Sequence, residues 1–301
     1  MLTFKDKIIL SPLWLLGSLP LWMLQAFAWV LHWLIWHVLK YRKKVVLRNL
    51  RNAFPEKTES EIVKIAKRFY LHLCDIFMES IYRMSATEAQ KRYVFEQVEV
   101  YHKLFEKGKD LIIMMGHYAN WEWTGSAWNQ VPYRTIGVYK PLMNKTFDRY
   151  FIFMRTRFGS QAVPLRNTFK EAVGCRQNND RFALLLVGDQ RPTPAEIKLW
   201  LTFMNQDTPI ILGPEKMAQK FDTAVIYLQV VPVKRGYYRV FPVLITENAS
   251  KTAENEVSTL FYSVLENQIK SQPEYYLWSH KRWKYTKADV EKIMERARGK
   301  K

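Results

Sequence analysis

The sequence predicts an α/β protein in which helices flank a central, mostly parallel or mixed sheet, preceded by an apolar membrane helix at the N-terminus. Three observations predict this fold. Short apolar runs alternate with segments whose apolar residues recur at helical spacing. The chain has 301 residues, of which 48% are hydrophobic, enough for a sizeable core. The first forty residues are far more apolar than the rest.

The N-terminal stretch, residues 8–39, contains no Lys, Arg, Asp or Glu. Pro12, Gly17 and Pro20 are expected to break its first third, whereas residues 21–39 are just long enough to cross a hydrocarbon core of about 30 Å. The flank that follows is basic and lacks acids, which keeps the remaining chain cytoplasmic by the positive-inside rule. We therefore expect a membrane anchor, residues 1–40, and a single cytoplasmic domain, residues 41–301. 

Two alternatives for the anchor stay open. Its five tryptophans are spread along the segment, as in a helix that lies in the membrane interface without crossing. A buried apolar hairpin in a soluble protein would also give this pattern.

The net charge of +18 calls for an anionic partner, which is nucleic acid, an anionic membrane face or an acidic protein. The two cysteines, Cys74 and Cys175, stand in unrelated contexts. They have neither the spacing of a metal site nor that of a disulfide framework.

The remaining elements follow in order from turn, cap and periodicity signals. A capping box at Thr58–Glu61 opens an amphipathic helix that runs to about residue 84. Further helices are expected at 144–158, closed by Gly159, from Thr168, at 213–221, at 254–270 and after 286. Strands are expected at 111–115, 135–139 and 181–190, with a strand pair at 224–233 and 237–246.

The stretch MMGHYANWEWTG, residues 114–125, carries the candidate chemistry. It follows a buried strand, and ligands gather at the carboxyl ends of strands in α/β sheets. His117 should lie in the turn and Glu122 in the first helical turn, with its carboxylate folded back onto the imidazole. That contact would hold one ring nitrogen protonated and leave the other free as a base, while Asn120 caps the helix. On these residues alone, a structural turn is the favoured explanation of the pattern, ahead of catalysis.

Six blocks in order resemble the lysophospholipid-acyltransferase-like superfamily, defined by His-x4-Asp/Glu, and more closely the late, or secondary, lipid A biosynthesis acyltransferases of Gram-negative bacteria. The likeness covers nearly the whole chain. The blocks are His117 to Glu122, GVYKP at 137–141, RTRFGS at 155–160 with PLR at 164–166, GDQ at 188–190, ILGPEKMAQKFDTAVI at 211–226 and YLWSHKRWK at 276–284.

The resemblance implies a glycerol-3-phosphate-acyltransferase-like fold and transfer of an acyl chain from a thioester to a lipid hydroxyl. It implies that His117 is the general base, that Glu122 orients it and that Arg155 stabilises the oxyanion. The expected substrate-binding residues are Asn120, Arg166, Asp189, Gln190, Lys281, Arg282 and Lys284. No cofactor or metal is expected, and direct attack without an acyl-enzyme is expected.

The implied partners are acyl carrier protein as donor, an anionic lipid acceptor and the cytoplasmic face of the bacterial inner membrane, with no nucleic acid. Two stretches depart from the family pattern. Residues 209–212 replace threonines that members often carry, and residues 191–203 match no member pattern. Other readings are the same chemistry on an aminolipid, lysophospholipid or other glycolipid, a membrane-anchored nucleic-acid-binding protein, and a thioesterase.

Overall fold

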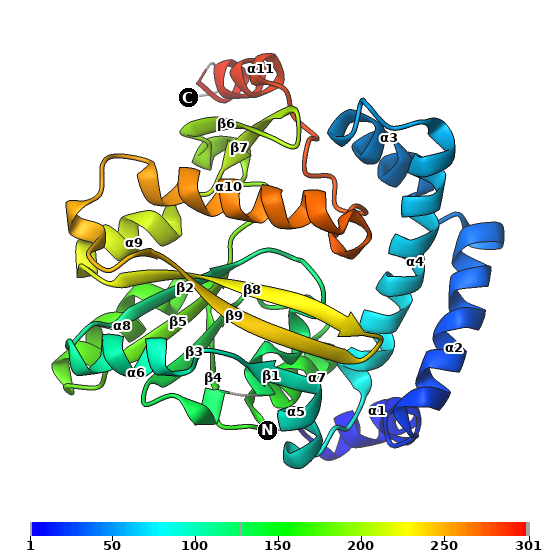
Figure 1. The fold of residues 1–301 in the computed structure, drawn as a ribbon, viewed down its shortest axis with the longest axis horizontal. Helices are drawn as coiled ribbons and strands as arrows, with labels where there is room; N and C mark the ends of the chain where they lie inside the picture. The colour runs from blue at the N-terminus through cyan, green and yellow to red at the C-terminus, as the bar shows by residue number, and fades with distance from the viewer. Residues whose placement is uncertain (1, 127, 299–301) are drawn as a thin grey trace.

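A seven-stranded sheet forms the centre of the molecule (Figure 1). The computed structural model describes residues 2–126 and 128–298. The strand order is β1-β9-β8-β2-β5-β3-β4, and neighbours run parallel except for the antiparallel pair β8 and β9. The strands are β1 (Tyr93–Phe95), β2 (Leu111–Met115), β3 (Arg134–Tyr139), β4 (Gln161–Pro164), β5 (Phe182–Val187), β8 (Ala224–Lys234) and β9 (Tyr237–Thr246). The predicted α/β fold is confirmed, although β1 and β4 were not expected.

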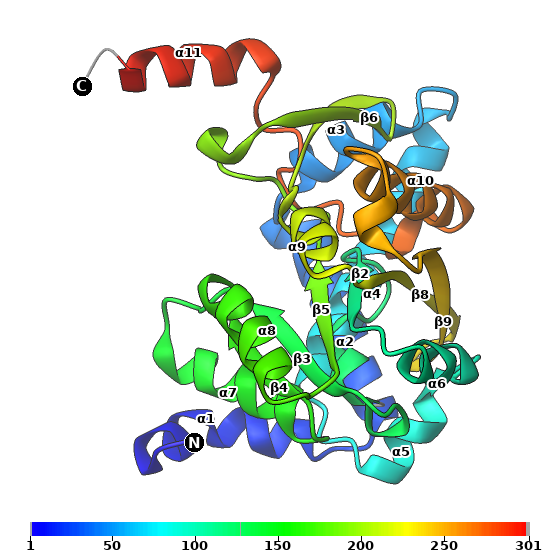
Figure 2. The ribbon, with the colours of Figure 1, turned by 90° about the vertical axis from the view of Figure 1, so that its left-hand side faces the viewer.

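Helices cover this sheet, and α6 and α8 lie on opposite sides of β5 (Figure 2). The capping box predicted at Thr58 is present, with the Thr58 hydroxyl and the Glu61 carboxylate each bonded to the other residue's backbone. The helices of this part of the chain are α3 (Lys43–Ala53), α4 (Glu59–Ile81), α5 (Ala86–Arg92), α6 (Glu99–Glu106), α7 (Lys145–Thr156), α8 (Thr168–Gln177), α9 (Gly213–Phe221), α10 (Glu256–Ser271) and α11 (Lys287–Arg298). The predicted helices α4, α7, α8, α9, α10 and α11 are confirmed to within a few residues, whereas α3, α5 and α6 were not expected.

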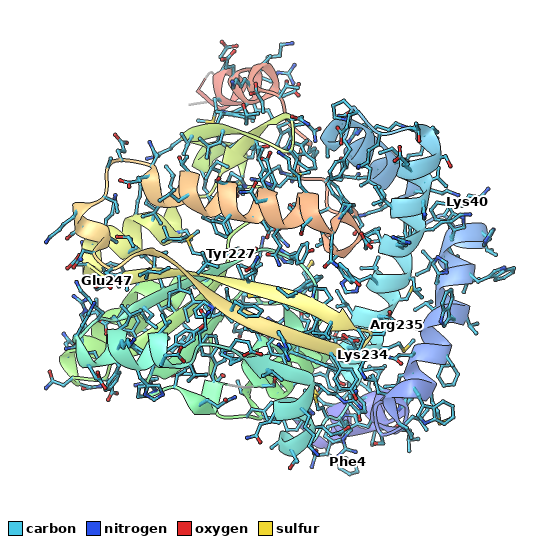
Figure 3. The ribbon with its side chains drawn as sticks, viewed as in Figure 1. Phe4, Lys40, Tyr227, Lys234, Arg235 and Glu247 are labelled. Atoms are coloured by element: carbon cyan, nitrogen blue, oxygen red, sulfur yellow. The ribbon has the colours of Figure 1, made fainter. Side chains whose placement is uncertain are left out.

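The N-terminal segment folds as α1 (Phe4–Gly17), α2 (Leu21–Trp33) and the π-helical turn η1 (Leu34–Leu39). The predicted break at Pro12 is wrong, because α1 runs through it. The hydroxyl of Ser11 donates to the carbonyl of Ile8, the group that loses its helical partner to the proline. Figure 3 shows Phe4 and Lys40 near the two ends of the segment. Residues 21–39 are long and apolar enough to cross a membrane, and 22% of the apolar stretch is buried.

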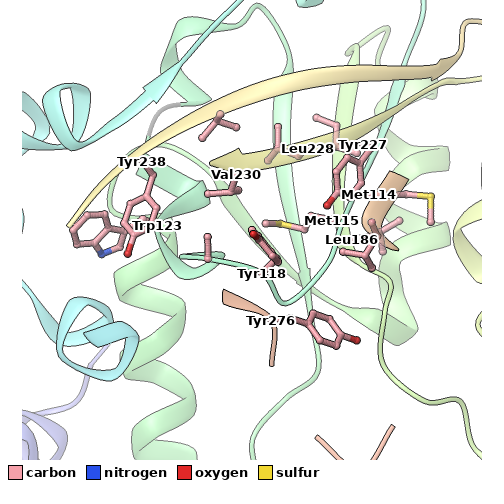
Figure 4. Close-up of a cluster of buried hydrophobic side chains, with 14 of the residues drawn as sticks. Met114, Met115, Tyr118, Trp123, Leu186, Tyr227, Leu228, Val230, Tyr238 and Tyr276 are labelled. Atoms are coloured by element: carbon pink, nitrogen blue, oxygen red, sulfur yellow. The ribbon is translucent and has the colours of Figure 1, made fainter. Parts of the chain in front are cut away.

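The core beneath the candidate site is built on β2, whose five residues are all buried. Such a continuous apolar run is typical of a parallel strand covered on both faces. Figure 4 shows Met114 and Met115 among aromatic side chains that include Tyr118, Tyr227 and Tyr276. This packing fixes the end of β2, and with it the start of the turn that carries His117.

A separate hairpin, β6 (Leu199–Phe203) and β7 (Gln206–Ile210), begins in the last five residues of the stretch 191–203 that matched no family pattern. Its two-residue turn, Met204 and Asn205, has φ values of 51° and 58°. Positive φ at both positions is typical of the tight turns that match strand twist. The sequence lacks the usual Asn-Gly signal there, which is why the hairpin was not predicted.

Candidate active site

The candidate site lies at the ends of two neighbouring parallel strands, β2 and β5. Met115 of β2 is paired with Val187 of β5, so the two strands end side by side. Gly116 follows β2 where a Cβ would come within 2.6 Å of the Leu265 side chain, so a larger residue here would require that side chain to move. His117 and Asp189 come next on the two strands and therefore meet at the carboxyl edge of the sheet.

His117 is held by Asp189 through two hydrogen bonds. Its Nδ1 lies 2.6 Å from Oδ1, and its backbone N–H donates to Oδ2 over 3.1 Å. Burial would raise the pKa of Asp189, but the charge of His117 and these two hydrogen bonds outweigh it and lower that pKa below its ordinary value. Because an ionised carboxylate only accepts, Nδ1 carries a proton, which makes Nε2 the nitrogen that can act as a base in the neutral ring.

The side chain of Gln190 contacts Nε2, the ring nitrogen of His117 that faces away from Asp189. Its amide Nε2 lies 3.0 Å from Nε2 of His117 and donates to it. The Gln190 side chain is exposed, and the ring of Trp121 lies edge-on to the imidazole at 5.1 Å. The basic nitrogen therefore faces a displaceable side chain at the surface.

The predicted contact between Glu122 and His117 is wrong in this structure. Glu122 forms a bidentate ion pair with Arg155 of α7, at 3.0 Å from Nε and 2.9 Å from Nη2, and accepts from the Trp121 indole. The 3₁₀ turn Glu122–Ser126 approaches α7 closely, since a Cβ on Gly125 would lie 2.6 Å from the Arg155 carbonyl. This approach turns the Glu122 carboxylate towards α7 and away from the imidazole.

Arg155 was predicted as a free oxyanion donor, but two of its nitrogens serve Glu122. Burial would lower its pKa, and the neighbouring Glu122 carboxylate raises that pKa above the ordinary value. Its Nη1 makes no hydrogen bond with another described residue, whereas Nε and Nη2 both bond to Glu122.

Asn120 caps the 3₁₀ turn, as predicted: its Oδ1 accepts from the Trp123 backbone N–H at 2.9 Å. Its Nδ2 donates to Glu79 at 2.6 Å, and the residue is fully buried. The predicted substrate contact is therefore wrong in this geometry, because both polar atoms are used inside the fold.

Arg166 lies exposed in the short turn after β4. It was expected to bind substrate, and it is not held by Asp189, whose carboxylate binds His117. The Arg166 guanidinium is therefore presented to solvent at the same carboxyl edge of the sheet.

The basic residues of the C-terminal block, residues 276–284, differ in how deeply they are buried. Arg282 is 1% exposed; its Nη2 donates to the Pro209 carbonyl at 2.7 Å and to the Tyr262 hydroxyl at 3.0 Å. The Tyr262 hydroxyl in turn donates to the Gly188 carbonyl, next to Asp189. The predicted contact of Arg282 with a substrate phosphate is therefore replaced by support of the strand end. Lys281 and Lys284 are exposed.

Tyr262 and Trp121 were not singled out from the sequence. Nothing in their local pattern distinguishes them from core aromatics. Asp189 did carry a signal, since Gly-Asp-Gln follows a buried strand. Among residues 2–126 and 128–298, no group of three or more His, Cys, Asp or Glu side chains forms a metal-binding cluster.

The fold and the site define an α/β protein with a histidine-aspartate pair at the carboxyl edge of a mostly parallel sheet. Residues 3–285 match the model of the bacterial lipid A biosynthesis acyltransferase family, and the chain belongs to this family. No curated protein matches the chain, so the assignment depends on the family model.

Proposed function

We propose that the protein transfers a fatty acyl chain from an acyl carrier protein thioester to a hydroxyl of a lipid A precursor. The observation that carries the proposal is the pair His117 and Asp189, held at 2.6 Å in a chain of this acyltransferase family. An alcohol of high pKa needs a base as it attacks, and a neutral imidazole with an oriented lone pair is such a base.

In the proposed reaction the acceptor hydroxyl displaces Gln190 from Nε2 of His117. Its proton passes to Nε2 as its oxygen forms a bond to the thioester carbonyl carbon. The tetrahedral intermediate then collapses, the carbon–sulfur bond breaks, and the leaving thiolate takes the proton from the imidazolium. Asp189 stabilises the imidazolium that forms between these steps.

The ion pair of Glu122 and Arg155 positions the site in this proposal and does not take part in the proton transfer. It joins the 3₁₀ turn to α7 beside Trp121, which contacts the imidazole ring. Glu122 therefore positions the turn, and Nη1 of Arg155 is the proposed donor to the oxyanion.

The charge of the chain suits the proposed substrates. Acyl carrier protein is acidic, lipid A precursors are anionic, and both are attracted by a net charge of +18. Lys281, Lys284 and Arg166 are exposed and suit phosphate groups. We place the protein at the cytoplasmic face of the inner membrane, where such lipids would reach it.

The test is acyl transfer by the purified full chain from radiolabelled acyl carrier protein to a purified lipid A precursor. His117→Ala should lower the rate by about 10²–10⁴-fold, the usual scale for a positioned base. His102→Ala, at an exposed site on α6, is the control and should keep full activity. Equal rates for His117→Ala and wild type would refute the mechanism.

The acceptor is tested separately by mass spectrometry of lipids from a deletion strain. Loss of one acyl chain from lipid A is expected. An unchanged lipid A together with an altered aminolipid or phospholipid would keep the chemistry and replace the acceptor. Thioester hydrolysis without acceptor, at the rate of transfer, would instead make the protein a thioesterase.

A further inference from the structure

We infer that the apolar helix α2, with its continuation η1, docks flat on the anionic cytoplasmic leaflet and does not cross the bilayer. The inference rests on the proposed membrane location but not on acyl transfer. It concerns a membrane-binding surface and not the reaction. Three observations support it: the contacts of the helix with the rest of the molecule, the exposed tryptophans on its outer face, and the basic residues on both sides of it.

Helix α1, at the N-terminal end of the apolar segment, is bonded to the catalytic domain. Asp6 of α1 is 1% exposed and forms a bidentate ion pair with Arg149 of α7, at 2.7 and 2.6 Å. The Gly17 carbonyl accepts from the backbone N–H of Arg83 at 2.8 Å, and a Cβ on Gly17 would lie 2.1 Å from the Ile81 carbonyl oxygen. Backbone touches backbone there, just before α2 begins.

Helix α2 and the residues beyond η1 also form hydrogen bonds with the catalytic domain. Arg235, on the β8–β9 turn, donates to the Gln25 carbonyl at 3.2 Å (Figure 3). Beyond η1, the Tyr70 hydroxyl of α4 donates to the Tyr41 carbonyl at 2.6 Å, and Trp36 packs edge-on against the Tyr70 ring. Figure 1 shows α2 lying beside α4 along its length.

A crossing orientation conflicts with these attachments. A helix of this length spans about 28 Å, so crossing would carry its neighbours into the hydrocarbon. Those neighbours include the ion pair of Arg235 and Asp75, and charged side chains inside the hydrocarbon core are strongly disfavoured. With α2 lying flat, the whole domain stays on one side.

The outer face of α2 carries a tryptophan stripe, defined as Trp22, Trp29 and Trp33. At 100° per residue these side chains lie within roughly 40° of one another around the helix. They are 68%, 52% and 58% exposed. Tryptophan prefers the headgroup level, and Trp29 lies near the middle of the segment, where a crossing helix would meet the bilayer centre. The stripe therefore fits a single interfacial depth along the helix.

The surrounding charge fits an anionic leaflet. From residue 7 to residue 55 the chain has no acidic residue, and the one acid before that stretch, Asp6, is buried in its ion pair. Lys5 and Lys7 are exposed on α1, and Lys40, Arg42 and Lys44 are exposed beyond η1. Basic residues flanking an apolar face strengthen binding to anionic lipids.

Exposed apolar side chains are also found on the part of the molecule that carries the candidate site. Met143, Phe147 and Phe153 expose apolar side chains on and before α7, and the Phe153 ring stacks on Trp14 of α1. Because α7 also carries Arg155, flat docking would hold the site at a constant height next to the headgroups.

Topology gives the first test. Cys74 and Cys175 are 1% exposed, so a single cysteine introduced at an exposed site can be labelled selectively by a membrane-impermeant maleimide. Lys5→Cys tests the N-terminal side of α2, and Lys292→Cys on α11 is the control on the catalytic domain. Flat docking predicts that both are labelled in inverted vesicles and neither in right-side-out vesicles. Labelling of Lys5→Cys from the outside, or from neither side, would overturn the inference.

Depth gives the second test. Nitroxides are attached to Trp22→Cys, Trp29→Cys and Trp33→Cys, and their depth is measured by power saturation in phosphatidylglycerol-phosphatidylethanolamine vesicles. Flat docking predicts three similar depths, about 5–10 Å into the interface. A crossing helix would place position 29 deepest and position 22 about 10 Å nearer the surface.

Flotation of the wild-type chain with the same vesicles separates the two failures. A chain that does not float refutes the membrane location itself and this inference with it. A chain that floats, but whose three labels differ in depth as in a crossing helix, refutes only the flat orientation.

Discussion

Nδ1 of His117 lies 2.6 Å from Oδ1 of Asp189, although the two residues stand 72 positions apart in the chain. The same carboxylate also accepts from the His117 backbone N–H, so one side chain sets both the ring orientation and the turn that carries it. A buried carboxylate that is kept ionised by its histidine also selects the tautomer with a free Nε2. Asp189 is therefore the positioning residue on which the proposed base depends.

Replacing the Asp189 carboxylate with an amide should abolish most of the activity without unfolding the protein. Asp189→Asn removes the charge that stabilises the imidazolium and no longer enforces the Nδ1–H tautomer, so kcat should fall by about 10²–10⁴-fold. The matched control is Asp180→Asn, an exposed carboxylate paired with Arg134, which should leave kcat unchanged. Wild-type kcat in Asp189→Asn would exclude this role.

Glu122 and Arg155 should behave as one unit in a double-mutant cycle. Each single change, Glu122→Gln or Arg155→Gln, leaves one partner of a bidentate pair without its counter-charge. We expect both variants to lose activity and the double variant to lose less than the sum, with a coupling of about 0.5–3 kcal/mol in kcat/KM. Additive losses would show that the two side chains act separately.

The C-terminal basic block should separate into binding and stability effects. Lys281→Ala and Lys284→Ala remove exposed charges, so the KM for the anionic acceptor should rise a few-fold with little change in Tm. Arg282→Met removes a buried guanidinium and its two hydrogen bonds, which should lower the free energy of unfolding by about 1.5–3 kcal/mol. Denaturant unfolding of the three variants measures the difference. Equal stability of all three would contradict the structural role given to Arg282.

Stability should fall as the pH rises from 6.5 to 8 because of Glu79. Burial and the nearby Asp75 raise the pKa of Glu79 to about 8, so the folded state keeps a proton that the unfolded state has lost. A folded state that binds more protons loses stability as they are removed. The buried His72 and His280, whose pKa values burial lowers to about 3 and about 4, act in the opposite direction near pH 6.5, where their imidazoles are still partly protonated in the unfolded state. A matched variant at position 79 shares this effect, so the difference between the two proteins isolates Glu79.

The matched variant for this prediction is Glu79→Gln. The amide oxygen can still accept from Asn120 and Tyr238, the two partners of the Glu79 carboxyl. Its Tm should therefore vary less between pH 6.5 and 8 than the Tm of the wild type. Parallel Tm profiles for the two proteins would rule out the assigned titration.

The sequence alone determined the elements whose signals are local. Helix α4 has its capping box and apolar spacing within one segment, and β2 is an unbroken apolar run. The apolar N-terminal segment and the turn position of His117 are equally local. Such features depend on chain stiffness, caps and burial of neighbouring residues, which a single stretch of sequence carries.

Only the tertiary structure decided which side chains meet. Asp189 reaches His117 because β2 and β5 run parallel in a set register, and Glu122 turns to Arg155 because the 3₁₀ turn packs against α7. Neither strand order nor helix packing can be read from residue spacing. The same holds for α2, whose composition permits a membrane crossing, while its contacts with α4 and with the β8–β9 turn favour lying flat. Contacts between distant segments follow from the whole packed core, and no local pattern contains them.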